Sequence, residues 1–183
     1  MESGWMVILS ILFEEFCNHF NGRLTWKTRV TNKSEWTEEI WQFFSELNKK
    51  DSRSFKEERE HMLVDYLWRD LTEYYQKIVL AVEHENDFQL DDFLETEVQH
   101  LLDIKADNKV AITYPQLGDE NRLLRDIGSR INQYATKINE NWLLILGFPT
   151  RKNKKLAIRF MGYVLDQWGH VIQKKDKTIF QSS

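Results

Sequence analysis

The sequence predicts a single domain of the α/β (α+β) class, in which one mixed central β-sheet is flanked by helices. Three observations lead to this prediction. The chain has 183 residues, which is enough for one sizeable core and short for two domains. It contains only seven Gly and two Pro, so long irregular segments are not expected. Helical and strand patterns also alternate along the chain, as they do where helices pack on a sheet.

Four segments carry apolar residues three and four positions apart, which is the spacing of one helix face. In the first segment, Phe13, Phe16 and Phe20 share that face. In the second, Ser34 can cap the helix, and the glutamates that follow it favour the positive end of the helix dipole. The predicted helices span residues 5–20, 35–47, 90–104 and 119–140.

Short β-prone runs lie between these helices. The most informative are residues 62–68 and 77–86, because the polar connection of residues 69–76 is short enough to make them antiparallel neighbours. Residues 24–30 alternate weakly and predict a further strand, whereas residues 48–59 are polar and predict a loop. Strands are also predicted at residues 109–114 and 142–147, followed by a hairpin of residues 156–165 and 170–173.

The two neighbouring strands carry carboxylates, which are unusual on a buried strand. Because side chains alternate along a strand, Glu83 and Glu85 point to one face and His84 to the other. If Asp65 on the preceding strand faces the same way as the glutamates, three carboxylates converge. Such a cluster is unfavourable unless a divalent cation, a proton or a cationic side chain neutralises it. The arrangement therefore predicts a metal site for phosphodiester chemistry, with Asp65, Glu83 and Glu85 as its ligands.

The order of these residues resembles the PD-(D/E)XK, or restriction-endonuclease-like, nuclease superfamily. The shared features are Asp65 on one strand, Glu83-x-Glu85-Asn86 at the end of the next, and then a helix and another strand. The motif is similar to that of uncharacterised bacterial and archaeal members, whose third core strand ends in Glu-x-Glu-Asn. Residues 101–115 also resemble the helix-to-strand passage of those proteins, and the similarity as a whole covers residues 60–147.

The resemblance implies a restriction-endonuclease-like core that hydrolyses nucleic-acid phosphodiesters, with Mg²⁺ or Mn²⁺ as cofactor. Asp65 and Glu83 would hold the metal, which lowers the pKa of an attacking water. Most relatives have Lys at the third motif position, where this chain has Glu85. His100 and Lys105 are the nearby substitutes, and Lys105 therefore joins Asp65, Glu83 and Glu85 as a catalytic candidate.

The net charge of −4 conceals an asymmetry along the chain. Residues 147–183 carry eight Lys or Arg against two Asp, whereas the remainder is strongly acidic. A dense basic cluster could hold a phosphate backbone while the carboxylates hold a metal, which makes nucleic acid the expected partner. A solvated loop between two strands would produce the same cluster without a binding role. The cluster consists of Arg151, Lys152, Lys154 and Lys155.

The carboxylate residues also have structural interpretations. Asp65 could form a surface ion pair with Arg59 or Arg69, and the two glutamates could mark the point where the strand leaves the core. His84 fits a packed strand histidine better than a metal ligand. The functional alternatives are thus a metal-dependent nuclease and a catalytically inactive module on the same fold. The missing lysine favours such a module, which would bind DNA or a protein partner.

We expect one domain with a helical N-terminal part (residues 1–59), a core (residues 60–147) and a C-terminal basic loop and hairpin (residues 148–183). The longest apolar stretch near the N-terminus is too short to span a membrane and lacks the features of a signal peptide. A cytoplasmic protein without a membrane partner is therefore expected. Cys17 stands alone, which excludes a disulfide framework. Seven Trp and eleven Phe permit a hydrophobic homodimer face.

Overall fold

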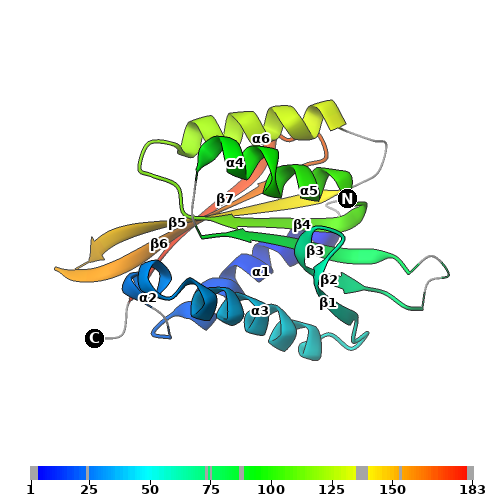
Figure 1. Ribbon diagram of the computed structural model, residues 1–183, viewed down its shortest axis with the longest axis horizontal. Coiled ribbons are helices and arrows are strands. Elements are labelled where there is room, and N and C mark those ends of the chain that lie inside the picture. Colours follow the sequence, from blue (N-terminus) through cyan, green and yellow to red (C-terminus); the bar gives the residue numbers. More distant parts are fainter. Residues whose placement is uncertain are drawn as a thin grey trace.

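The computed structural model describes residues 4–23, 25–72, 74, 76–86, 89–134, 140–152 and 154–180, with the backbone alone for residues 4–8, 152 and 180. Within this part of the chain, a seven-stranded mixed sheet carries helices on both faces (Figure 1). The prediction of one mixed sheet flanked by helices is confirmed. The elements are α1 (Gly4–Phe20), α2 (Trp26–Thr31), α3 (Lys33–Lys50), β1 (Lys56–His61), β2 (Val64–Arg69), β3 (Ile78–Glu85), α4 (Leu90–Glu95), α5 (Glu97–Asp103), β4 (Ala106–Thr113), α6 (Glu120–Tyr134), β5 (Asn141–Lys152), β6 (Lys155–Leu165) and β7 (Val171–Phe180).

The strands lie in the sheet in the order in which they occur along the chain. β1, β2 and β3 form an antiparallel meander, β4 and β5 run parallel to β3, and β6 and β7 are again antiparallel. The two parallel steps require crossovers, which α4 and α5 supply between β3 and β4, and α6 supplies between β4 and β5. The carboxyl ends of β3, β4 and β5 therefore lie at the same edge of the sheet.

Each face of the sheet has its own hydrophobic cluster. α1 and α3 cover one face with an aromatic-rich core, and α4, α5 and α6 cover the other (Figure 1). On β3, Val82 belongs to the first cluster and Ala81 to the second. Because side chains alternate, Glu83 and Glu85 share the face of Ala81, under α5, and His84 lies on the opposite face with Val82. The alternation inferred from the sequence thus holds for these three residues.

Three local predictions in the N-terminal part are wrong. The strand predicted over residues 24–30 is α2 where the structure describes it (Leu24 lies outside the described residues), because Thr25 Oγ1 accepts a first-turn backbone N–H at 3.0 Å and starts a helix. α3 is capped by Asn32 rather than Ser34, since Asn32 Oδ1 accepts a first-turn N–H at 3.4 Å. The predicted polar loop contains β1, an edge strand whose side chains are mostly exposed.

The later elements are found where they were expected, with different bounds. The helix predicted over residues 90–104 is interrupted at Thr96, which separates α4 from α5. Of the helix predicted over residues 119–140, α6 covers the part up to Tyr134, and residues 135–139 lie outside the described residues. β6 starts one residue before its predicted span. β5 and β7 extend well beyond their apolar runs, because cross-strand pairing continues into polar sequence. None of the described helices is both long and apolar enough to cross a lipid bilayer.

Candidate functional site

β2 and β3 separate at the point where their carboxylates lie. The last paired residues at this end are Tyr66 and Val82, so the next positions along the two strands are Asp65 and Glu83. Beyond the last pair, Asp65 Oδ2 accepts the backbone N–H of His84 at 2.8 Å. A side-chain carboxylate thus replaces a backbone carbonyl as the acceptor for this N–H, and the bond holds Asp65 beside Glu83.

Asp65 and Glu83 form a carboxyl pair in which each side chain influences the pKa of the other. Glu83 is only 3% exposed. Burial, followed by repulsion from Asp65 and Glu97, raises the pKa of Glu83 to about 10. Burial also raises the pKa of Asp65, although hydrogen bonds from the His84 backbone and from Glu83 oppose that shift. The pair therefore retains a proton at neutral pH, which is one of the ways in which converging carboxylates are neutralised.

α5 adds two further titratable side chains to this pair. Glu97 and His100 are three residues apart and share one face of the helix. His100 Nδ1 lies 3.1 Å from Glu83 Oε1. Burial raises the pKa of Glu97 to about 7, and repulsion from Glu85 and Asp65 adds to the shift. We refer to Asp65, Glu83, Glu85, Glu97 and His100 as the carboxylate cluster.

From the sequence, His100 is a candidate only as a substitute for the missing lysine, and Glu97 has no assigned role. The signal that could have found both is their spacing of three, on the first helical segment that packs over the acid-bearing strand. That spacing puts an acid and an imidazole on one helix face. The spacing makes the two residues candidates, but it does not reveal whether their face of α5 packs on the sheet, which only the tertiary structure shows.

The donors of the carboxylate cluster are suited in kind to a hard divalent cation. Within the described part of the chain, no group of three or more His, Cys, Asp or Glu side chains is arranged as a set of metal ligands. Mg²⁺, however, commonly binds through one or two carboxylates and fills its other positions with water and substrate phosphate. The Asp65–Glu83 pair fits such a site, because a cation could replace the proton that the raised pKa of Glu83 favours.

The structure does not bring Lys105 to the cluster, which corrects its inclusion among the catalytic candidates. Lys105 is exposed and precedes β4, whereas the β4 residue beside Glu83 is Ala111. At about 3.3 Å per strand residue, Lys105 and Ala111 are about 20 Å apart. Lys109 lies on the same face of β4 as Ala111, but it is buried and its Nζ lies 2.6 Å from Glu140 Oε2.

The suggested surface ion pairs of Asp65 are not the ones the structure forms. Arg59 Nη1 lies 3.1 Å from Glu38 Oε1, and Arg69 Nη2 lies 3.0 Å from Glu58 Oε2. Both arginines are thus engaged with other carboxylates, and the described partners of Asp65 belong to β3. The surface-ion-pair interpretation of Asp65 therefore fails on geometry.

His84 follows its structural interpretation. Its ring is buried on the face opposite to the glutamates, where Nε2 lies 3.1 Å from the hydroxyl oxygen of Tyr114. Burial lowers the pKa of His84 to about 3, with the charge of Arg29 as a further cause. The neutral ring anchors the β3 strand from behind, while the backbone N–H of the same residue holds Asp65.

The basic cluster forms the tip of the β5–β6 hairpin, which extends past the edge where β3 ends (Figure 1). Arg151 lies five residues beyond Leu146, the β5 residue in line with Glu85 across the sheet. The rise and spacing of strands place the tip about 20 Å from Glu85. The side chain of Lys152 is outside the described part, and the exposed members are Arg151, Lys154 and Lys155.

No protein-family model matches the chain, and no curated protein is significantly similar to it in sequence. The residues of the carboxylate cluster and the order of the strands that carry them are therefore the features that bear on function.

Proposed function

We propose that this protein is a divalent-metal-dependent, nuclease-like hydrolase of nucleic-acid phosphodiesters. The observation that carries the proposal is the pair of the half-buried Asp65 and the buried Glu83 at the point where β2 and β3 separate. A buried carboxyl beside a half-buried one is unfavourable for stability alone, because apolar side chains of similar size usually pack better in a core. Binding of Mg²⁺ or Mn²⁺ in place of the proton on Glu83 would give the pair a function.

The order of the elements supports the proposal. The PD-(D/E)XK resemblance implies an acid on one strand, two acids at the end of the next, and then a helical passage to another strand. Asp65 on β2, Glu83 and Glu85 on β3, and the α4–α5 crossover to the parallel strand β4 follow that order. Fold alone does not establish an activity, so the proposal depends on the chemistry of the carboxylate cluster.

The cluster offers each group that metal-assisted hydrolysis requires. Asp65 and Glu83 would hold the cation, which when bound polarises phosphoryl oxygens and lowers the pKa of an attacking water. His100 contacts Glu83 at 3.1 Å and fixes the orientation of its carboxylate. Glu97, whose pKa burial raises to about 7, is suited to accept a proton at neutral pH. Glu97 would thus take the task that most relatives assign to lysine.

The basic hairpin tip provides a second contact for a polyanion. The separation of about 20 Å between the tip and Glu85 corresponds to about six nucleotides of one strand in a duplex. A nucleic acid that lies across the edge of the sheet could therefore present one phosphate to the carboxylate cluster and others to Lys154 and Lys155. This arrangement favours a substrate of several nucleotides over a free nucleotide.

The proposal is tested by calorimetric titration with Mn²⁺, followed by cleavage assays on single- and double-stranded DNA and RNA. The wild-type chain and the Glu95→Gln control, which changes an exposed acid on α4, should bind Mn²⁺ with the same affinity. Glu83→Gln should lose at least tenfold in affinity and abolish cleavage. Mn²⁺-dependent cleavage that survives Glu83→Gln would overturn the site, and a wild-type chain that neither binds Mn²⁺ nor cleaves would overturn the function.

A catalytically inactive nucleic-acid-binding module is the second candidate, favoured by Glu85 at the position where most relatives have lysine. It predicts duplex binding with a steep salt dependence in EDTA and no cleavage with any divalent cation. Duplex binding with a flat salt dependence would argue against a nucleic-acid-binding module and leave a protein partner as the alternative.

A further inference from the structure

The turn that joins β1 to β2 exposes two large apolar side chains. Leu63 is 76% exposed and Met62 is 57% exposed. His61 pairs with Val64, so Met62 and Leu63 are the two central residues of a tight hairpin turn. Arg69 Nη2 donates to Met62 Sδ at 3.7 Å, which directs this side chain back along the hairpin. Leu63 is therefore the side chain that the turn presents to solvent.

The backbone of this turn is unfavourable for the residues that occupy it. Met62 and Leu63 both have left-handed conformations, with φ of 55° and 69°. Two-residue hairpin turns with positive φ favour Asn-Gly, because a large side chain approaches its own backbone in that conformation. Met-Leu is thus a poor choice both for the backbone and for exposure to water. Residues that are held against their local preference in this way cluster at functional sites.

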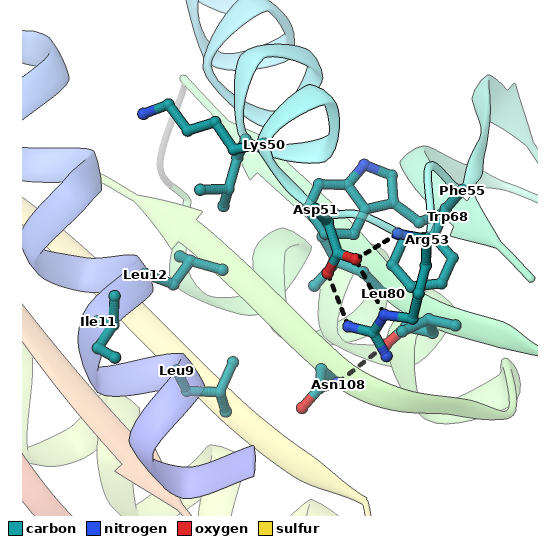
Figure 2. A pocket seen from close by; sticks show the side chains of 12 residues that line it. Leu9, Ile11, Leu12, Lys50, Asp51, Arg53, Phe55, Trp68, Leu80 and Asn108 are labelled. Carbon is teal, nitrogen blue, oxygen red and sulfur yellow. Dashed lines mark hydrogen bonds and ion pairs between the residues drawn. The ribbon is translucent and has the colours of Figure 1, made fainter. Parts of the chain in front are cut away.

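The other end of the hairpin is well packed, and it fixes the position of the turn. Phe55, which precedes β1, stacks on Trp68 of β2, with ring centroids 5.8 Å apart and an interplanar angle of 17°. Figure 2 shows these two side chains together beside an apolar pocket. Arg69 Nη2 also lies 3.0 Å from Glu58 Oε2, an ion pair that joins β2 to β1. The turn is therefore held in place by the structure behind it rather than by its own residues.

The turn lies beside the carboxylate cluster. Toward this edge of the sheet, Tyr66 is the last residue of β2 that pairs with β3, and Leu63 lies three residues further on. Leu63 precedes Asp65 by two residues, so their Cα atoms are at most about 7 Å apart. Burial raises the pKa of Asp65, and the charge of Glu60, at the start of the turn, adds to this shift. The turn is thus close enough to contact the same substrate as the cluster.

The turn and the basic hairpin tip lie on opposite sides of the carboxylate cluster. The turn is between β1 and β2 and the tip is between β5 and β6, whereas Asp65 and Glu83 lie on β2 and β3. A nucleic acid that crosses the sheet edge from the tip to the cluster therefore reaches the turn next. A separation of about 7 Å corresponds to about two base steps of a duplex strand. Glu60 is exposed on the turn and repels phosphates, so the apolar Leu63 meets a base rather than the backbone.

We propose that Leu63 is a wedge that inserts between two neighbouring bases of duplex DNA, next to the phosphate that the carboxylate cluster holds. This inference rests on the proposed function, and it adds duplex DNA, opened at one base step, as the substrate. Leucine is among the side chains that proteins insert between base steps, where it unstacks the bases and kinks the duplex. Glu83 is 3% exposed, so a phosphate must come close to the protein surface to reach the cluster. A kinked duplex makes that approach more easily than a straight one.

The probe is a short DNA duplex that carries 2-aminopurine, a base that fluoresces more strongly when it is unstacked, at several positions. Ca²⁺ replaces Mg²⁺ as a hard cation for the cluster. Anisotropy measures binding, and a denaturing gel confirms that the duplex is intact. The fluorescence should rise by roughly twofold or more when the wild-type chain binds. Leu63→Asn should bind without this rise and should fold normally, because Asn adopts the left-handed backbone readily.

Two variants serve as controls. Leu63→Met keeps a side chain that proteins also insert between base steps, so it should retain the rise in fluorescence. Leu71→Asn changes another leucine, 56% exposed, which lies beyond the opposite end of β2. It should therefore give the same rise as the wild-type chain.

Binding of the wild-type chain without a rise, or an equal rise with Leu63→Asn, would overturn the wedge and leave the proposed hydrolase in place. A rise that depends on Leu63, in a chain that does not cleave nucleic acid, would support the wedge and the non-catalytic binding module. Absence of duplex binding would overturn the wedge, and the Mn²⁺ titration decides separately on the hydrolase. A wild-type dimer that Leu63→Asn dissociates in analytical ultracentrifugation would also overturn it, because the turn would then contact a second copy of the chain.

Discussion

Replacement of Glu83 by Gln should make the cation-free protein more stable at neutral pH. Burial raises the pKa of Glu83 from an ordinary value of 4.5 to about 10, so the folded chain keeps a proton that the unfolded chain releases. Stability must then fall as pH rises above about 4.5, by up to about 1.4 kcal/mol per pH unit. Gln is neutral in both states, so the variant lacks this dependence. The destabilising effect is absent at acidic pH and grows towards neutrality.

The size of the effect follows from the number of protons involved. Between pH 5 and pH 7 nearly one proton separates the folded from the unfolded state at Glu83, which amounts to about 2–3 kcal/mol. Glu83 is 3% exposed, so solvent screening removes little of this. Gln has almost the same volume, and its amide can donate to Asp65 as the protonated carboxyl does. Glu97 adds a similar pH dependence to both proteins, and the difference between them isolates Glu83.

The assay is urea unfolding followed by circular dichroism at pH 5, 6 and 7 in EDTA. The curves of wild-type protein and Glu83→Gln should nearly coincide at pH 5 and diverge by pH 7, with Glu83→Gln the more stable. Glu95→Gln, which removes an exposed carboxylate two residues before Glu97, should follow the wild-type profile. If the free energies of unfolding of the wild-type protein and Glu83→Gln change with pH in parallel, Glu83 does not keep a proton in the folded protein at neutral pH.

Two further outcomes are expected. Tyr114→Phe removes the hydroxyl that accepts the indole N–H of Trp36 and contacts His84 Nε2, so two buried groups lose a partner. Urea unfolding should show that the free energy of unfolding falls by about 2–4 kcal/mol. An unchanged urea midpoint would contradict a stabilising role for these hydrogen bonds. Changing Lys154 and Lys155 to Gln should weaken duplex DNA binding and reduce the slope of log K against log salt by about 0.9 per lost phosphate contact. Fluorescence anisotropy in increasing KCl measures this slope, and an unchanged slope would leave the hairpin tip without a role in binding.

The sequence was most informative where a backbone period decides the outcome. The faces of Glu83, His84 and Glu85 follow from the alternation of a strand, which needs no knowledge of tertiary packing. The long apolar run of β5 was likewise recognised as buried, because both of its faces are covered by helices. β1 escaped recognition because an edge strand of sequence Lys-Glu-Glu-Arg-Glu-His carries no apolar alternation.

Which side chains make up the site depends on tertiary packing, and the helix and strand periods of the sequence do not encode that packing. Glu97 reaches the cluster only because α5 packs on β3 with that face inward. Lys105 is a candidate from the sequence because it follows the predicted helix closely along the chain. In the structure, β4 begins at Ala106 and runs toward the cluster, which leaves Lys105 at the far end of the strand. Distance in space along a strand grows by about 3.3 Å per residue, and a few residues suffice to remove a side chain from a site.

Asp65 has one role that is purely structural, and separating it from metal binding decides how the site should be interpreted. Its Oδ2 accepts the His84 N–H at 2.8 Å where the β2–β3 ladder ends. Asp65→Asn keeps an oxygen acceptor but loses the charge, whereas Asp65→Ala loses both. If the pair holds a cation, Asp65→Asn should keep the free energy of unfolding within about 1 kcal/mol of the wild-type value and lose Mn²⁺ affinity. Asp65→Ala should lose Mn²⁺ affinity and also about 1–3 kcal/mol of the free energy of unfolding. If Asp65 only completes the ladder, Asn should bind Mn²⁺ as the wild-type chain does. A purely structural role as acceptor for the His84 N–H accounts for Asp65 but leaves the buried carboxyl of Glu83 unexplained. For this reason we expect Asp65→Asn to lose Mn²⁺ affinity.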